Sequence, residues 1–184
     1  MTAARSISDG EFFAGAAVGL RLVEPGDCTP RYVAWLNDPQ VNRYLETRWT
    51  TQDEASVAAF VAAMRATPDS YLFAIVECGG GRHVGNLKIG PISRWHGHAD
   101  LSYFLGERSC WGRGYASDAI ASAVRIAFTR LGLHRLQAGV YAGNVGSCRA
   151  LAKNGFALEG TFRDQLVGPD GREDHLWYGL LRSG

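Results

Sequence analysis

The sequence predicts a single α/β domain built on a mixed sheet with helices on both faces. Short β-rich runs alternate with amphipathic helical segments along the 184 residues, which is the pattern of a layered α/β fold. A glycine-bearing turn at residues 109–116 separates an apolar strand from a long helix. From that strand onward the expected order is strand, turn, helix, strand, helix.

The N-terminal part predicts two helices that follow one strand. Residues 1–15 show little periodicity and are expected to form a flexible tail, so that residues 16–184 make the single domain. Residues 18–23 predict the opening strand. A threonine followed by a proline at 29–30 predicts a helix start, and residues 51–54 have the spacing of a capping box that opens a second helix.

The central part predicts a hairpin and then a loop. Residues 71–76 and 83–89 are β-rich and flank a glycine-rich turn, as in a β-hairpin. Residues 91–98 are expected to form a loop that carries Trp95, His96 and His98.

The C-terminal part predicts a helix and three further strands. The long helix is expected to begin near Ser117, and residues 135–141 predict the strand that follows it. A short helix should end at Gly155, where glycine suits a left-handed cap. The last two strands are expected at residues 156–162 and 175–181.

The turn at residues 109–116 is a candidate anion site. Gly112 and Gly114 let backbone amides approach a ligand, and the next helix begins with unpaired N–H groups and a positive dipole end. A pyrophosphate is the natural guest of such a turn. Turns also use glycine for conformational reasons alone, so this pattern needs its context.

Composition excludes several classes of function. The formal net charge is +1 and the basic residues are spread along the chain, so neither nucleic acid nor an anionic membrane is an expected partner. The N-terminus lacks the features of a signal peptide, and no segment is apolar enough to span a membrane. The four cysteines lack metal-ligand spacing, so no metal is expected. These observations favour a cytoplasmic enzyme.

Several motifs together resemble a known family. They occur in order at residues 35–39, 99–105, 111–116, 131–134, 144–147 and 154–160. In this arrangement the chain resembles the GNAT superfamily of acyl-CoA-dependent N-acyltransferases, and within it the Rim-like branch that includes ribosomal-protein N-terminal acetyltransferases. One position departs from the superfamily pattern, because Ser109 stands where Gln or Arg is common. Backbone amides would then be the main donors of the cradle.

The resemblance implies a central, mostly antiparallel sheet with splayed strands, and acetyl-CoA as the co-substrate. In this family the strand before the cradle pairs with the pantetheine arm and the cradle holds the pyrophosphate. The implied cofactor-binding residues are Tyr103, Phe104, Leu105, Gly112, Arg113, Gly114, Tyr115, Ala116, Asn144 and Ser147. Asn144 alone could equally be a helix cap.

The resemblance also suggests catalytic residues for transfer of the acetyl group by direct attack of an amine. Asp100 is the first candidate for the base, although it could be an ordinary surface carboxylate, and many family members deprotonate the amine through water. Ser147 or Tyr141 is the candidate acid that protonates the thiolate, with Ser147 favoured.

The acceptor is expected at two aromatic and charged segments. Tyr44, Glu46, Arg48 and Trp49 lie in the first, and Trp95 and His98 in the second. Each tryptophan could instead be a partly exposed packing residue. Weak motifs favour a nucleotide-linked aminosugar or another small amine as the acceptor. The Rim-like motifs favour a protein N-terminus instead. A non-catalytic acyl-CoA sensor is the alternative class, and the chain could be a monomer or a homodimer.

Overall fold

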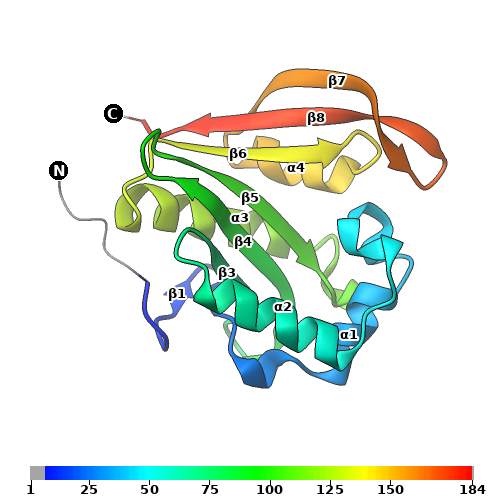
Figure 1. The fold of residues 1–184 in the computed structure, drawn as a ribbon. Helices are drawn as coiled ribbons and strands as arrows, with labels where there is room; N and C mark the ends of the chain where they lie inside the picture. Colours follow the sequence, from blue (N-terminus) through cyan, green and yellow to red (C-terminus); the bar gives the residue numbers. More distant parts are fainter. Residues whose placement is uncertain (1–6, 184) are drawn as a thin grey trace.

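The computed structural model describes residues 7–183, which form one eight-stranded sheet with helices on both faces (Figure 1). The strands are β1 (Phe13–Ala14), β2 (Val18–Leu22), β3 (Tyr71–Glu77), β4 (His83–Ser93), β5 (His98–Leu105), β6 (Arg135–Tyr141), β7 (Ala157–Gly168) and β8 (Gly171–Leu181). Their order across the sheet is β1-β2-β3-β4-β5-β6-β8-β7. Only the pair β5 and β6 is parallel. The predicted mixed sheet is confirmed.

The helices follow capping signals that are visible in the sequence. They are α1 (Pro30–Asn37), α2 (Glu54–Ala66), α3 (Tyr115–Arg125) with a π-helical extension (Ile126–Arg130), and α4 (Val145–Lys153). The side chain of Thr29 caps α1 by accepting the Tyr32 amide at 3.4 Å, as predicted. The predicted cap of α2 is wrong by two residues: Asp53, not Thr51, forms the capping box with Ser56.

Residues 7–15 are not the flexible tail that the sequence suggests. β1 pairs with β2 in register Phe13↔Leu20, and Ile7 is buried in the core. The carboxylate of Asp118 on α3 also accepts the backbone amides of residues 16–18 at 2.7–3.1 Å. This segment is therefore part of the fold, and the prediction for residues 1–6 lies outside the described residues.

Several predicted boundaries move because pairing extends the strands. β4 continues to Ser93, so the predicted loop at residues 91–98 shrinks to a turn at residues 94–97. β7 and β8 are likewise longer than predicted and meet at a tight turn. α3 begins at Tyr115, two residues before Ser117, because Gly114 with φ of 81° acts as its N-cap.

Two apolar clusters lie on opposite faces of the sheet. The larger one joins the sheet to α3 and includes Phe73, Leu87, Ile120 and Leu136. The smaller one joins it to α1 and α2 and includes Trp35 and other residues of those helices. In Figure 1, α2 lies in front of the sheet and α3 behind it.

The sheet opens between β5 and β6. These strands pair only from His98↔Arg135 to Asp100↔Gln137. Beyond this point residues 101–105 and 138–141 separate, and Figure 1 shows the two strands diverging. Their facing backbone edges are therefore left without a strand partner, which is the splayed arrangement that the family resemblance implies.

Candidate active site

A cavity of about 740 Å³ lies where β5 and β6 diverge. Residues 101–104 and 138–141 line it from the two strands. Other predicted site residues also line it, namely Tyr44, Glu46, Asn144 and Ser147. The cavity is therefore built mainly from the edges that the splay exposes, and a narrow ligand arm could form sheet-like hydrogen bonds with them.

The glycine turn that was predicted to bind an anion lies between the short 3-10 turn Arg108–Cys110, which follows β5, and α3. Gly112 and Gly114 have φ of 72° and 81°, a left-handed conformation that glycine adopts without strain. Within the part of the chain that the structure describes, the backbone amides of residues 112–116 donate no hydrogen bond. A Cβ added at either glycine would meet nothing within 4 Å. The turn thus offers open space lined by unpaired donors, which suits a phosphate group.

One predicted contact in this region is already occupied. The indole Nε1 of Trp111 donates to the carbonyl oxygen of Leu105 at 2.9 Å, and Leu105 does not line the cavity. The free edge of β5 therefore ends at Phe104. The phenol of Tyr115 points elsewhere, because it donates to Glu77 at 3.1 Å, so Tyr115 could serve the cradle only through its backbone.

Ser147 lies in the cavity at the first turn of α4. The side chain of Asn144 caps this helix by accepting the Ser147 amide at 3.2 Å. The hydroxyl of Ser147 lies 2.6 Å from the hydroxyl of Tyr103. Burial raises the pKa of Tyr103 to about 12, so this phenol keeps its proton at neutral pH. Two neutral hydroxyls therefore form a chain at the bottom of the splay.

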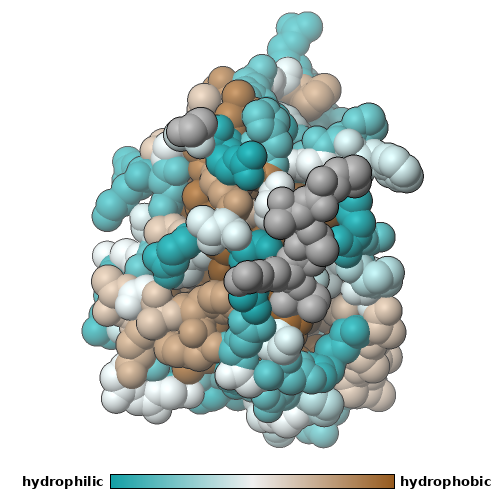
Figure 2. All heavy atoms as spheres, turned by 90° about the vertical axis from the view of Figure 1, so that its left-hand side faces the viewer, coloured by the Kyte–Doolittle hydropathy of each residue, from teal (hydrophilic) through white to brown (hydrophobic). Residues whose placement is uncertain are grey.

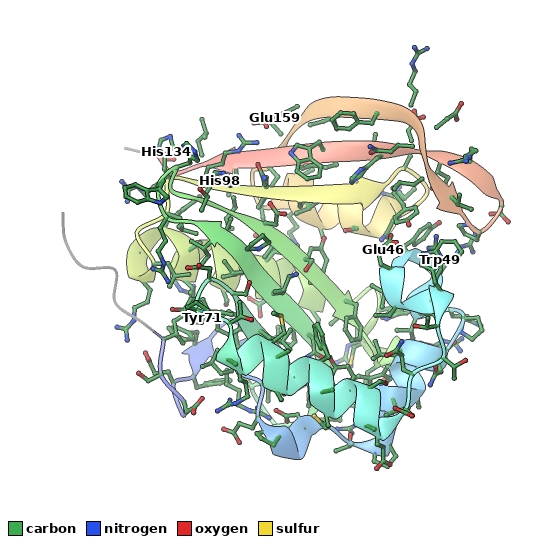
Figure 3. All side chains as sticks on the ribbon, in the orientation of Figure 1. Glu46, Trp49, Tyr71, His98, His134 and Glu159 are labelled. Atoms are coloured by element: carbon green, nitrogen blue, oxygen red, sulfur yellow. The ribbon has the colours of Figure 1, made fainter. Side chains whose placement is uncertain are left out.

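A cluster of side chains from three elements lies at the cavity, which Tyr44, Glu46 and Tyr141 line, whereas Arg48 and Trp49 contact these residues from outside the lining. The hydroxyl of Tyr141 donates to Glu46, and Arg48 lies 3.2 Å from the same hydroxyl. Trp49 donates its indole N–H to Glu46 at 3.1 Å, and the rings of Tyr44 and Tyr141 are 5.6 Å apart. Figure 3 shows Glu46 and Trp49 together on the segment between α1 and α2. The first group of predicted acceptor residues is thus gathered at one place.

Burial and the hydrogen bond to Glu46 raise the pKa of Tyr141. Because its proton is directed to Glu46, Tyr141 is less suited than Ser147 to protonate a thiolate in the splay.

Two predicted acceptor residues, Trp95 and His98, lie elsewhere. Trp95 is 96% exposed, and His98 stacks with His96 at the turn between β4 and β5. Figure 3 shows His98 at the opposite end of the sheet from Glu46. Figure 2 views that end, where the broadest hydrophobic area lies low on the face and hydrophilic residues occupy much of the rest. Their assignment is corrected because β4 is longer than predicted, which moves the turn away from the cavity.

Asp100 also lies outside the cavity lining. It belongs to the last residue pair before the strands diverge, and its carboxylate accepts the side-chain amide of Gln137 at 2.8 Å. Asp100 is therefore poorly placed to take a proton from an amine in the cavity.

Several polar residues that line the cavity were not predicted as site residues, and His175 and Lys88 are two of them. Both lie in strands that were predicted, and strand alternation places each on one face. Alternation alone does not indicate which element covers that face.

Among residues 7–183, no group of His, Cys, Asp or Glu side chains is arranged to hold a metal ion. No helix in this part of the chain is long and apolar enough to cross a membrane.

A splayed sheet with an amide cradle beside the opening is the architecture of the N-acetyltransferase class. The profile of the GNAT acetyltransferase domain matches residues 18–157, and the chain belongs to this family. It is 29% identical over 165 residues to the uncharacterized N-acetyltransferase p20 of Bacillus licheniformis. The aligned region covers 89% of this chain and 92% of p20.

Two solved structures share the fold. RimJ of Mycobacterium smegmatis, in complex with CoA-disulfide, has a TM-score of 0.78 and 25% identity, over 93% of this chain and 84% of that one. Spermidine N-acetyltransferase of Vibrio cholerae, in complex with CoA and spermine, has a TM-score of 0.79 and 18% identity, over 90% and 95% of the two chains. The predicted GNAT family is confirmed, and the similar solved structures include a Rim-type acetyltransferase, as the resemblance implied.

Proposed function

We propose that the protein transfers the acetyl group of acetyl-CoA to a primary amine by direct attack within a ternary complex. The observation that carries this proposal is the row of unpaired amides at residues 112–116, in the turn that connects the strand lining the cavity to α3. These amides would hold the pyrophosphate. The free edge at residues 101–104 would pair with the amides of the pantetheine arm, with the Asn144 Nδ2 group nearby.

The thioester needs no activation by the protein, so positioning and proton transfer are the main tasks. The amine nitrogen forms a bond to the acetyl carbon, the carbon–sulfur bond breaks, and the sulfur leaves with the electron pair. Ser147 would protonate the departing thiolate through its hydroxyl. Tyr103 can donate its own proton to Ser147 Oγ, which leaves the Ser147 proton free to point into the cavity.

Replacing Ser147 with alanine is expected to lower kcat by roughly 10²-fold, the lower end of the range for general acid–base catalysis. The apparent affinity for acetyl-CoA should change little, because the backbone cradle is intact. Tyr103→Phe should give a smaller loss, since Ser147 remains. Steady-state kinetics with calorimetry of CoA binding would check this. An unchanged kcat in Ser147→Ala would remove Ser147 from the proton path.

The charges in the cavity select among acceptors. Glu46 and Lys88 are the charged side chains that line it, besides the titratable His175. Lys88 lies on β4 opposite Leu72 and Ser102, and within the described residues it forms no ion pair or hydrogen bond. Around it the cavity wall is apolar and includes Leu36, Leu45, Val57, Phe60, Leu72 and Phe104.

An unpaired ammonium group beside an apolar wall favours an anionic partner. A polyamine, such as the spermine bound by the Vibrio cholerae enzyme, carries several positive charges and would need several carboxylates. We therefore propose a compact amine with an apolar body and one anionic group. An amino acid or a phosphate-linked aminosugar meets this description. The first residue of a protein does not, because its carboxyl group is part of a peptide bond and carries no charge.

The acceptor proposal is tested with an apolar α-amino acid and its uncharged amide. We expect the wild-type protein to prefer the acid by about tenfold in kcat/KM, because an ionic hydrogen bond contributes roughly 1.5 kcal/mol or more. Lys88→Met should remove the preference, whereas Lys153→Met, at an exposed position at the end of α4, should retain it. Faster turnover of spermine or of short peptides would contradict the proposal.

A further inference from the structure

His175 lines the cavity from β8. It lies on β8 directly opposite Tyr141 of β6, and the pair Gly139↔Trp177 is two positions further along the ladder, on the same face of the sheet. A Cβ built on Gly139 would overlap the His175 Nε2 atom. The imidazole therefore lies over the backbone of Gly139, which belongs to the free edge of β6 that lines the cavity. Glycine at position 139 makes this approach possible.

Its surroundings fix the tautomer of the imidazole. Nδ1 lies 2.7 Å from the Oε1 atom of Gln165 on β7. An amide oxygen only accepts hydrogen bonds, so Nδ1 carries the proton and Nε2 carries the lone pair. The ring is held edge-on against Trp177, with centroids 5.3 Å apart. The nitrogen with the lone pair is thus the one that lies over Gly139.

The imidazole is also uncharged at neutral pH. Partial burial lowers the pKa of His175 below its usual value of 6.5, while the nearby Glu46 carboxylate opposes this shift. Other charged and titratable groups on the neighbouring elements are Tyr44, Arg48, Tyr141, Arg163, Asp164 and Glu173. Of these, Tyr141 donates to Glu46, Arg48 donates to Tyr141 and to backbone carbonyls, and Glu173 accepts the amide of Gly143.

The other candidate bases are less available. Asp100 is outside the cavity lining and accepts from Gln137. Both carboxylate oxygens of Glu46 accept hydrogen bonds, one from Tyr141 and one from Trp49. Nε2 of His175 donates or accepts no hydrogen bond with any residue in the range 7–183.

We propose that His175 is the general base of the transfer, an inference that rests on the proposed function. Nε2 takes the proton that the amine loses as its nitrogen bonds to the acetyl carbon, and the thiolate is protonated separately by Ser147. The resulting imidazolium is stabilised by Glu46 and returns its proton to solvent. Gln165 is a positioning residue, because it acts only through Nδ1.

The test compares pH–rate profiles of the wild type, His175→Ala and the matched control His96→Ala, an exposed histidine at the far end of the sheet. We expect His175→Ala to lower kcat/KM by roughly 10²-fold at neutral pH. The wild-type profile should fall on the acid side with a midpoint below 6.5, and the variant should lack this limb. Added imidazole should restore part of the rate, and His96→Ala should match the wild type.

CoA affinity and thermal unfolding of each variant separate chemistry from folding. If His175→Ala does not fold, Gln165→Leu provides the second test, with an expected smaller loss of kcat and a shifted acid limb. A His175→Ala variant that binds CoA, turns over within threefold of the wild type and keeps the acid limb would overturn the inference alone. A wild-type protein that binds no CoA or acetylates no amine would overturn the proposed function and this inference with it.

Discussion

Gly114→Val is expected to reduce acetyl-CoA affinity by at least about 10²-fold. Gly114 has φ of 81°, a conformation in which a β-branched residue is strained. The open space above it is the space that the pyrophosphate would fill, because no atom lies within 4 Å of a Cβ built there. Valine would therefore both distort the cradle and occupy it. Isothermal titration calorimetry with acetyl-CoA measures the effect.

Gly132→Val is the matched control for this prediction. Gly132 also has positive φ, 69°, and open space at its Cβ position, but it follows the extension of α3 at the other end of that helix. The Gly132→Val variant should lose about as much stability as Gly114→Val but retain the CoA affinity of the wild type. Equal affinity in Gly114→Val and the wild type would remove this turn from the co-substrate site.

Asp27→Ala is expected to lower the free energy of unfolding by about 3 kcal/mol, the cost of removing one partner from a buried ion pair. Asp27 is 9% exposed. Its two oxygens accept from the guanidinium of Arg21, each at 2.7 Å, and one also accepts the Glu24 amide at 2.8 Å. The change would leave the Arg21 guanidinium without its partner. Urea denaturation monitored by fluorescence measures it.

The pH dependence of this effect follows from the pKa of Asp27. Burial alone would raise that pKa, but the hydrogen bonds from Arg21 and Glu24 outweigh burial, so the net shift is downward. A lowered carboxyl pKa means stability that is present above the unfolded-state pKa and lost as pH falls through the folded-state pKa. The difference between wild type and Asp27→Asn should therefore shrink below about pH 4.

Asp69→Ala is the control for the stability prediction. Asp69 forms an ion pair with Arg94 at 2.7 Å, but both side chains are about half exposed. Exposed pairs contribute between zero and about 1 kcal/mol. A loss from Asp69→Ala as large as that from Asp27→Ala would contradict the account of the buried pair.

Local signals predicted much of the fold. β6 has the predicted bounds, and Thr29 and Asn144 cap helices as their residue types suggest. Gly155 ends α4 with φ of 84°. These features depend on residues close together in the sequence, so a single chain segment contains the information. The turn at residues 112–116 is likewise formed by residues that are close together in the sequence.

The remaining features depend on pairing between distant segments. The extension of β4 to Ser93 follows from its pairing with β5, and this moved Trp95 and His98 to the far end of the sheet. The point where β5 and β6 separate decides that Asp100 stays outside the cavity. His175 reaches the cavity only because β8 pairs with β6 and residue 139 has no side chain. Periodicity assigns a residue to a face, but it does not identify what lies across that face.

The most direct test of the account is thiol release from acetyl-CoA by the wild-type protein in the presence of single amines, with mass spectrometry of the products. The panel pairs apolar amino acids and phosphate-linked aminosugars with spermine and short N-terminal peptides. We predict amine-dependent thiol release, with an equal amount of N-acetylated product, from an amine that carries one anionic group. Binding of acetyl-CoA without thiol release for any amine would contradict the account and indicate a sensor of acyl-CoA.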